Sequence, residues 1–186
     1  FYLLPMTFGT LLQQSRLAYE KQPNQVEKVA NRQLFAEGGH WMAQKMNDLF
    51  PQKATSIDHS IPFNGYGFFK YGLCLSAFLM SFCFFAHYNV ALIPLSVLVF
   101  YFLEIHFVFL FPLLIDKVPT PLWASIKTTY KIGIFKTLVY VLRIAVFMMV
   151  GLFYSKNPLK NWHIGCLFII IWYQHVIVSS FLRNRL

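Results

Sequence analysis

A glutamate and a histidine stand two residues apart inside the apolar stretch LVFYFLEIHFVFLF, residues 98–111. Glu104 and His106 are residue types that can transfer protons, and an imidazole can also ligate haem. Ionisable groups are costly inside a bilayer, so they normally pair with one another or take part in function. Two further apolar runs carry such groups, Arg143 in one and His175 in the other. These four side chains are the candidates for chemistry.

Glu104 and Arg143 are predicted to form an ion pair. Counted from the expected helix ends at about 1.5 Å per residue, the four groups lie roughly 10–17 Å deep, in one layer. Arginine keeps its charge in apolar surroundings and therefore needs a nearby carboxylate. Tyr101 and Tyr140 lie one turn from Glu104 and Arg143 respectively, so the phenols are expected to complete a polar cluster. The pair either fixes helix register or acts in function, with Arg143 holding an anionic head group or Glu104 exchanging protons.

His106 is predicted to point away from Glu104, because helical positions two apart are separated by about 200°. It would then face another subunit, a pigment, or His175 across a second cleft. Two histidines on different membrane helices could ligate a haem or chlorophyll. However, each helix carries one such histidine without a spacing motif, so a histidine bonded to a tyrosine or a carbonyl is the commoner outcome.

The three cysteines do not indicate a metal site. Cys74, Cys83 and Cys166 lie in apolar runs without CxxC or Cys/His spacing, which predicts neither a zinc site nor a disulfide framework. The chain also lacks GxSxG, HExxH, P-loop and dinucleotide-binding motifs, and it has no multi-histidine box. These absences lower the expectation of an enzyme without removing it.

The elements that must position these residues are apolar and long. The chain is 57% hydrophobic with 21 Phe, and 12% of its residues are charged, against about 25% in soluble domains. Four segments approach the length that spans a bilayer. An all-α integral membrane protein is therefore predicted, a bundle of about four transmembrane helices over residues 71–88, 90–115, 132–154 and 162–182. A tight hairpin joins the first two through HYN, residues 87–89.

Residues 1–70 differ from this transmembrane domain, residues 71–186. A helix is expected to open near Asn24, to be interrupted at Gly38 and Gly39, and to stop at Pro51. Its imperfect apolar stripe among basic residues indicates an amphipathic segment, which lies on the membrane surface or packs on a partner or on the bundle. PFNGYGFF, residues 62–69, is expected to form a glycine-rich turn into the first membrane helix.

The net charge of +9 is spread between apolar runs instead of forming one basic face, which argues against nucleic-acid binding. Lys and Arg are retained on the cytoplasmic side of membranes. Most of them fall in residues 1–70, in the connection after the second helix, and in the C-terminal tail. Both termini are therefore predicted to be cytoplasmic, and the HYN turn to lie outside.

Two functional hypotheses follow. The first is a small polytopic subunit or accessory factor of a larger membrane complex, in contact with the lipid bilayer and with other membrane subunits. The alternative is a membrane-bound enzyme acting on a lipid or isoprenoid substrate, in which Arg143 binds the head group and Glu104, His106 or His175 transfers protons. Transport is less favoured, because four helices without inverted repeats line a substrate path poorly.

Overall fold

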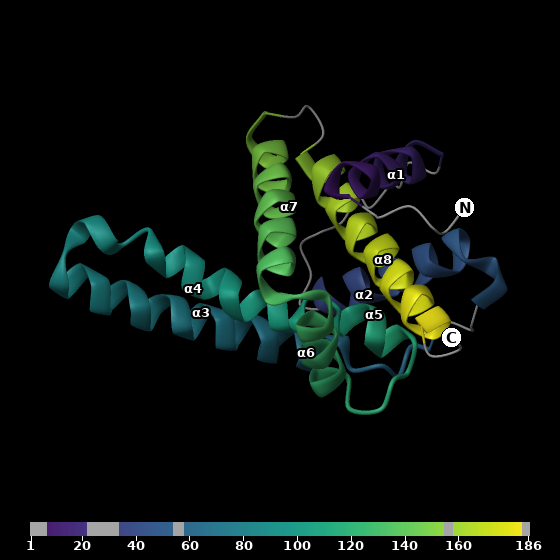
Figure 1. The fold of residues 1–186 in the computed structure, drawn as a ribbon, viewed down its shortest axis with the longest axis horizontal. Coiled ribbons are helices and arrows are strands. Elements are labelled where there is room, and N and C mark those ends of the chain that lie inside the picture. The colour runs from purple at the N-terminus through teal and green to yellow at the C-terminus, as the bar shows by residue number, and fades with distance from the viewer. Residues whose placement is uncertain (1–6, 22–33, 54–57, 155–157, 184–186) are drawn as a thin grey trace. The chain divides into compact units, whose positions relative to one another are not determined.

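The structure, a computed structural model, describes residues 7–21, 34–53, 58–154 and 158–183. Within these ranges every regular element is helical, which confirms the all-α prediction (Figure 1). The longer helices are α1 (Phe8–Lys21), α2 (Leu34–Leu49), α3 (Phe63–Tyr88), α4 (Leu95–Glu104), α5 (Leu110–Ile115), α6 (Pro121–Ile132), α7 (Ile134–Tyr154) and α8 (Pro158–Arg183). Three short 3₁₀ helices are η1 (Pro51–Lys53), η2 (Val90–Leu92) and η3 (Ile105–Phe107).

Three segments are long and apolar enough to cross a membrane, namely Phe63–Tyr88, Val90–Ile115 and Ile134–Phe153. They correspond to the first three predicted spans. The first begins earlier than expected, because the helix starts at Phe63 instead of near Tyr71. α8 occupies the place of the fourth, but it is not among the segments that meet the length and hydropathy requirement in the described residues, so its crossing stays a prediction. The division into residues 1–70 and 71–186 also stays a prediction.

The chain forms two compact units. Unit 1 contains α1, α2 from His40 onward, α7 from Arg143 onward, and α8. Unit 2 contains α2 up to Gly39, the helices α3 to α6, and α7 up to Leu142.

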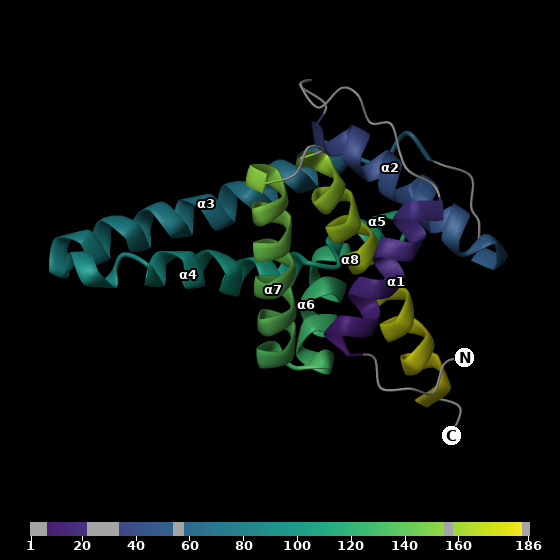
Figure 2. The ribbon, with the colours of Figure 1, turned by 90° about the horizontal axis from the view of Figure 1, so that it is seen from above.

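Within unit 2, α3 and α4 run side by side as an antiparallel hairpin (Figures 1 and 2). The predicted tight turn is present: α3 ends at Tyr88, and the side chain of Asn89 accepts a hydrogen bond from the Ala91 N–H at 2.9 Å. This Asx interaction begins η2, and α4 follows directly after Pro94.

The second span is not one continuous helix, contrary to the prediction. α4 ends at Glu104, η3 follows, and α5 begins only at Leu110. Pro112 supplies the physical reason, because proline has no N–H to donate to the carbonyl of residue 108 and its ring would collide with that carbonyl. The helical backbone therefore breaks in the turn before Pro112.

The first turns of α2 and the start of α3 interlock through two glycines. A side-chain carbon at Gly39 would collide with the ring of Phe63, and one at Gly67 would collide with Phe35. The Ala36 N–H also donates to Asn64 Oδ1 at 2.9 Å. The expected interruption of the helix at Gly38 and Gly39 is wrong, because α2 continues through both. Its predicted stop before Pro51 is confirmed, and its predicted beginning near Asn24 lies outside the described residues.

Unit 1 is built around α8, whose middle is buried on nearly all sides. α1 lies across it (Figure 2). α1 buries Leu11, Ser15 and Tyr19, which share one face at a spacing of four residues. α7 approaches α8 closely: a side-chain carbon at Gly151 would collide with Asn161, whose Nδ2 donates to the Phe147 carbonyl at 3.0 Å.

Candidate functional site

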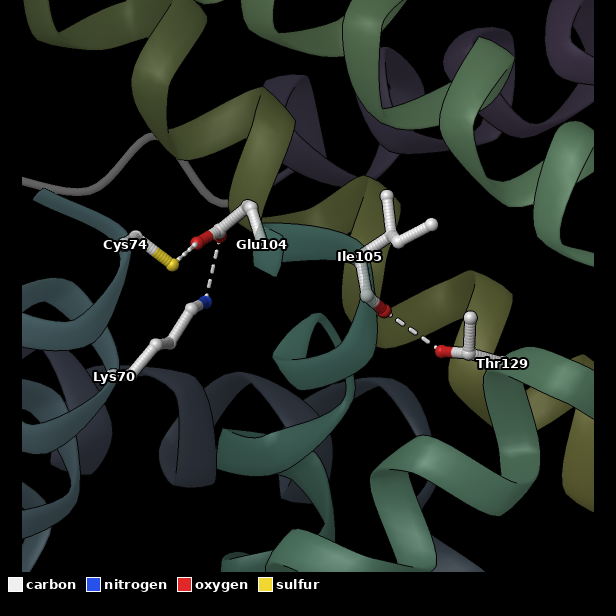
Figure 3. A network of polar contacts seen from close by, with 5 residues as sticks. All are labelled: Lys70, Cys74, Glu104, Ile105 and Thr129. Atoms are coloured by element: carbon white, nitrogen blue, oxygen red, sulfur yellow. Dashed lines mark hydrogen bonds and ion pairs between the residues drawn. The ribbon is translucent and has the colours of Figure 1, made fainter. Parts of the chain in front are cut away.

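The buried charges of unit 2 lie between α3 and α4. Lys70 Nζ on α3 is 2.7 Å from Glu104 Oε1 at the end of α4, and the two side chains are 5% and 13% exposed (Figure 3). The Cys74 thiol, one turn after Lys70, donates to the other carboxylate oxygen at a sulfur–oxygen distance of 3.9 Å. Lys70 Nζ also lies 4.9 Å from the centre of the Tyr71 ring. Cation and carboxylate neutralise each other, and both are withdrawn from solvent.

Lys70 is not among the residues that the sequence predicts for the site. The predicted first span begins after Lys70, because Gly65 and Gly67 are typical of a turn. In the structure these glycines are helical, so Lys70 lies two turns inside α3. The sequence did contain one indication of this site: Lys70 and Cys74 are four residues apart, so on a helix the two side chains share a face.

Arg143 belongs to unit 1, whereas Glu104 belongs to unit 2. The guanidinium of Arg143 lies 5.7 Å from the centre of the Phe8 ring. This is cation–π geometry, which favours an arginine in apolar surroundings. The predicted ion pair between Glu104 and Arg143 stays a prediction, and so do the places of Tyr101 and Tyr140 in one cluster. Tyr140 has Lys136 Nζ 5.7 Å from its ring centre.

A second polar contact supplies a hydrogen-bond donor to the backbone at the break in the second span. The Thr129 hydroxyl on α6 donates to the carbonyl of Ile105 at 2.7 Å (Figure 3). Thr129 and Ile105 are fully buried. Because a buried carbonyl without a donor is costly, this bond accounts for how the break is accommodated.

His106 has contacts inside unit 2. Its Nδ1 lies 2.7 Å from the Phe102 carbonyl, one turn earlier on the helix. Its ring is 5.3 Å from the Phe102 ring and 5.7 Å from that of Tyr130 on α6. This is the commoner outcome that the sequence suggested, a histidine bonded to a carbonyl. Haem or chlorophyll ligation by His106 and His175 stays a prediction.

In unit 1, Gln174 is buried on α8, as expected for a polar residue that must find partners, and His175 is half-buried. His163 is a further buried histidine of this helix. Its ring lies 4.9 Å from that of Trp41 and 6.3 Å from that of Tyr19. The aromatic surroundings indicate a packing role.

Across the described ranges no group of three His, Cys, Asp or Glu side chains could hold a metal ion. Of the three cysteines, Cys74 is buried, Cys166 is half-buried and Cys83 is exposed.

An ion pair outside the candidate spans connects the segment before the first span with the segment after the second. Lys117 Nζ, just after α5, is 2.8 Å from Asp58 Oδ2, which precedes α3. The Ser60 hydroxyl and N–H donate to the other oxygen of Asp58, at 2.6 and 2.9 Å. Lys117 and these donors hold the pKa of Asp58 well below its usual range. The start of the first span and the end of the second are therefore on one side of the hairpin.

No known protein family matches the chain, and no similarity to a characterised protein or to a solved structure was found.

Proposed function

We propose that the protein is a subunit or accessory factor of a larger membrane complex, and that α3 packs against a helix of another subunit. A stripe of exposed small residues along α3 supports this. At about 100° per residue, its members fall on one face of the helix, opposite the buried face, and the exposed side chains of Phe68 and Leu79 lie on the same face. We call it the α3 small-residue stripe: Gly65, Gly72, Ser76, Cys83 and Ala86.

The residues of the buried face of α3 are Phe63, Gly67, Lys70 and Cys74. They meet α2 and α4, so this side of the helix is already occupied inside the chain. On the opposite side, an added side chain at Gly65 or Gly72 would meet nothing within 4 Å. The stripe is therefore open.

Small residues on a membrane helix allow another helix to approach closely, and this close packing drives association where lipid removes the hydrophobic effect. A glycine facing lipid gains no such contact and costs about 1 kcal/mol in helix propensity relative to alanine. The members of the stripe are separated by three, four or seven residues, so they return to one face of the helix after one or two turns, and a second helix can approach along that face.

The test is co-isolation from the native membrane in mild detergent. Gly72→Phe and Ser76→Phe place a bulky ring on the stripe and are expected to release the partner. Leu73→Phe alters an exposed position about 60–100° away from Gly65, Gly72, Ser76 and Cys83 and is the matched control. Retention of the same partner by all three variants would refute the stripe as its docking face.

Cys83 provides an independent test because it lies on the stripe and is exposed. Mild oxidation of the membrane is expected to link Cys83 to a cysteine introduced on the partner helix. If the only product were a disulfide-linked dimer of this 21.8 kDa chain, the stripe would join two identical copies and the proposal of a larger complex would fail.

The predicted orientation is part of the proposal. The connection between the second span and α7 carries Lys117, Lys127 and Lys131, whereas the turn between α3 and α4 carries no Lys or Arg. The connection is therefore placed on the cytoplasmic side, together with the N-terminal segment. A fourth crossing by α8 would return the C-terminus to that side. Labelling of single cysteines at residues 91 and 127 by a membrane-impermeant reagent, from each side in turn, tests this orientation.

The alternative of a lipid or isoprenoid enzyme remains an untested hypothesis. Glu104, one of its expected proton-transfer groups beside His106 and His175, forms an ion pair with Lys70.

A further inference from the structure

The exposed face of α6 is aromatic and basic. Trp123 and Tyr130 are 57% and 56% exposed. Lys127 lies between them on the same face, with its Nζ 5.6 Å from the centre of the Trp123 ring. Lys131 is exposed beside them, and Lys136 is exposed at the start of α7.

The face of α6 turned into unit 2 is small and hydroxylated. Ser125 and Thr129 are fully buried there, and Thr129 donates to the carbonyl of Ile105. This distribution is the reverse of that in a helix of a water-soluble protein, which buries its large apolar side chains. Outward-facing Trp and Tyr next to Lys are typical of a helix at a membrane–water interface.

The chain connections hold α6 at the end of two candidate spans. Four residues separate Asp116 from Pro121, the first residue of α6, and Gly133 alone separates α6 from α7. Gly133 has φ of 106°, a conformation that glycine adopts without strain, so the backbone turns sharply there. A helix linked so closely to the ends of two spans cannot lie far from the membrane surface.

The charged side chains that follow Asp116 in the sequence have one sign. The chain has no Asp or Glu after Asp116, whereas nine Lys and Arg follow it. Within the described ranges, Lys117 is paired with Asp58, but Lys127, Lys131 and Lys136 form no ion pair. Three exposed ammonium groups next to two aromatic anchors therefore have no carboxylate partner among the described residues.

We propose that α6 lies in the membrane–water interface and binds the head groups of anionic phospholipids through Lys127, Lys131 and Lys136, with Trp123 and Tyr130 as anchors. The inference goes beyond the subunit proposal, because it concerns a different surface and holds with or without a partner for α3. An anionic lipid surface supplies a countercharge for these lysines, and the aromatic rings fit the head-group region.

The first experiment measures lipid affinity of the full chain in neutral detergent, from the shift in its thermal unfolding midpoint on addition of phosphatidylglycerol or phosphatidylcholine. The wild type is expected to prefer phosphatidylglycerol. Lys127→Gln and Lys131→Gln are each expected to lower that affinity about fivefold, and together roughly 25-fold, with little change for phosphatidylcholine. Inorganic phosphate is expected to give no shift.

Lys160→Gln is the matched control, because Lys160 is an exposed lysine of unit 1 that is distant from α6 in the sequence. This variant should keep the wild-type preference for phosphatidylglycerol. Lys127→Arg with Lys131→Arg keeps the charge and should also keep it, which separates charge from any effect on folding. The proposal fails if the wild type binds both lipids equally, if the double glutamine variant retains its preference, or if phosphate alone gives the same stabilisation.

The second experiment measures depth. In bilayers of brominated lipid, the fluorescence lost on Trp123→Phe reports Trp123 alone. That component should be quenched more by bromine near the head group than by bromine near the bilayer centre. Three results would overturn the interfacial position: no quenching of this component by either lipid, equal quenching by both lipids, or stronger quenching by bromine near the bilayer centre.

Discussion

Lys70 and Glu104 form an ion pair with its charged atoms 2.7 Å apart, made by two helices of one hairpin and almost wholly withdrawn from solvent. Removal of one partner leaves the other charge buried without compensation, which typically costs about 3–5 kcal/mol, whereas replacement of both by apolar residues is often neutral. Lys70→Met is therefore expected to lower the free energy of unfolding in mixed micelles by about that amount. The double variant Lys70→Met/Glu104→Leu should recover most of it.

Lys21→Met controls for the loss of a lysine, because Lys21 is exposed, and its effect should stay within about 0.5 kcal/mol. If Lys70→Met were no more destabilising than Lys21→Met, the pair would contribute nothing to stability.

Gly39 and Gly67 are expected to tolerate no side chain. Gly39→Ala meets the Phe63 ring and Gly67→Ala meets Phe35, so each should destabilise by about 1–3 kcal/mol through overpacking. Gly38→Ala and Gly65→Ala are matched controls in open space. These should stabilise by up to about 1 kcal/mol, because alanine favours helix. Thermal unfolding followed by circular dichroism gives all four values, and the same sign for each pair would contradict the interlocking of α2 and α3.

Thr129→Val should destabilise by about 1–3 kcal/mol, because the buried carbonyl of Ile105 loses its donor. Thr128→Val is the control one residue away: the Thr128 hydroxyl donates to the Ala124 carbonyl of its own helix, at 2.8 Å. That carbonyl lies inside α6, where backbone bonds satisfy it, so the change should be close to zero. Equal losses for the two variants in chemical unfolding would show that the bond across the break has no special role.

The Asp58–Lys117 ion pair predicts a pH dependence. The pKa of Asp58 is lower in the folded protein than its unfolded value of about 4. The stabilisation is therefore fully present above pH 4 and is lost as the pH falls through the folded pKa. The unfolding midpoint of the wild type should exceed that of Asp58→Asn above pH 4, and the difference should shrink on acidification. High salt should also reduce it, because the pair is exposed. A difference that grew on acidification would contradict this assignment.

The sequence predicted the positions of the membrane helices better than their ends and interruptions. Long apolar runs identify spans by themselves, so the segments that became α3, the α4–α5 pair and α7 could be found. The start of α3 could not be placed, because Gly65 and Gly67 are common in turns. That Gly67 lies in a helix depends on Phe35, which is distant in sequence.

Pro112 signals the break before α5, because it cannot donate to the Val108 carbonyl. The donor to the Ile105 carbonyl, which Pro112 does not affect, had no such signal in the sequence. Thr129 reaches Ile105 only because α6 folds back against η3, and nothing in the residue types specifies that contact. The pairing of Lys70 with Glu104 likewise could not be predicted, because it requires the helix α3 to begin before Lys70.

The hairpin of α3 and α4 has a consequence for how the protein enters a bilayer. Either helix inserted alone would carry one uncompensated charge into the hydrocarbon, and insertion scales place this penalty at about 2.5–3.5 kcal/mol for a charge at the helix centre. Inserted together, with Lys70 facing Glu104, the two helices bring no net charge. Biogenesis should therefore favour simultaneous release of both helices from the insertion machinery, with the ion pair already closed.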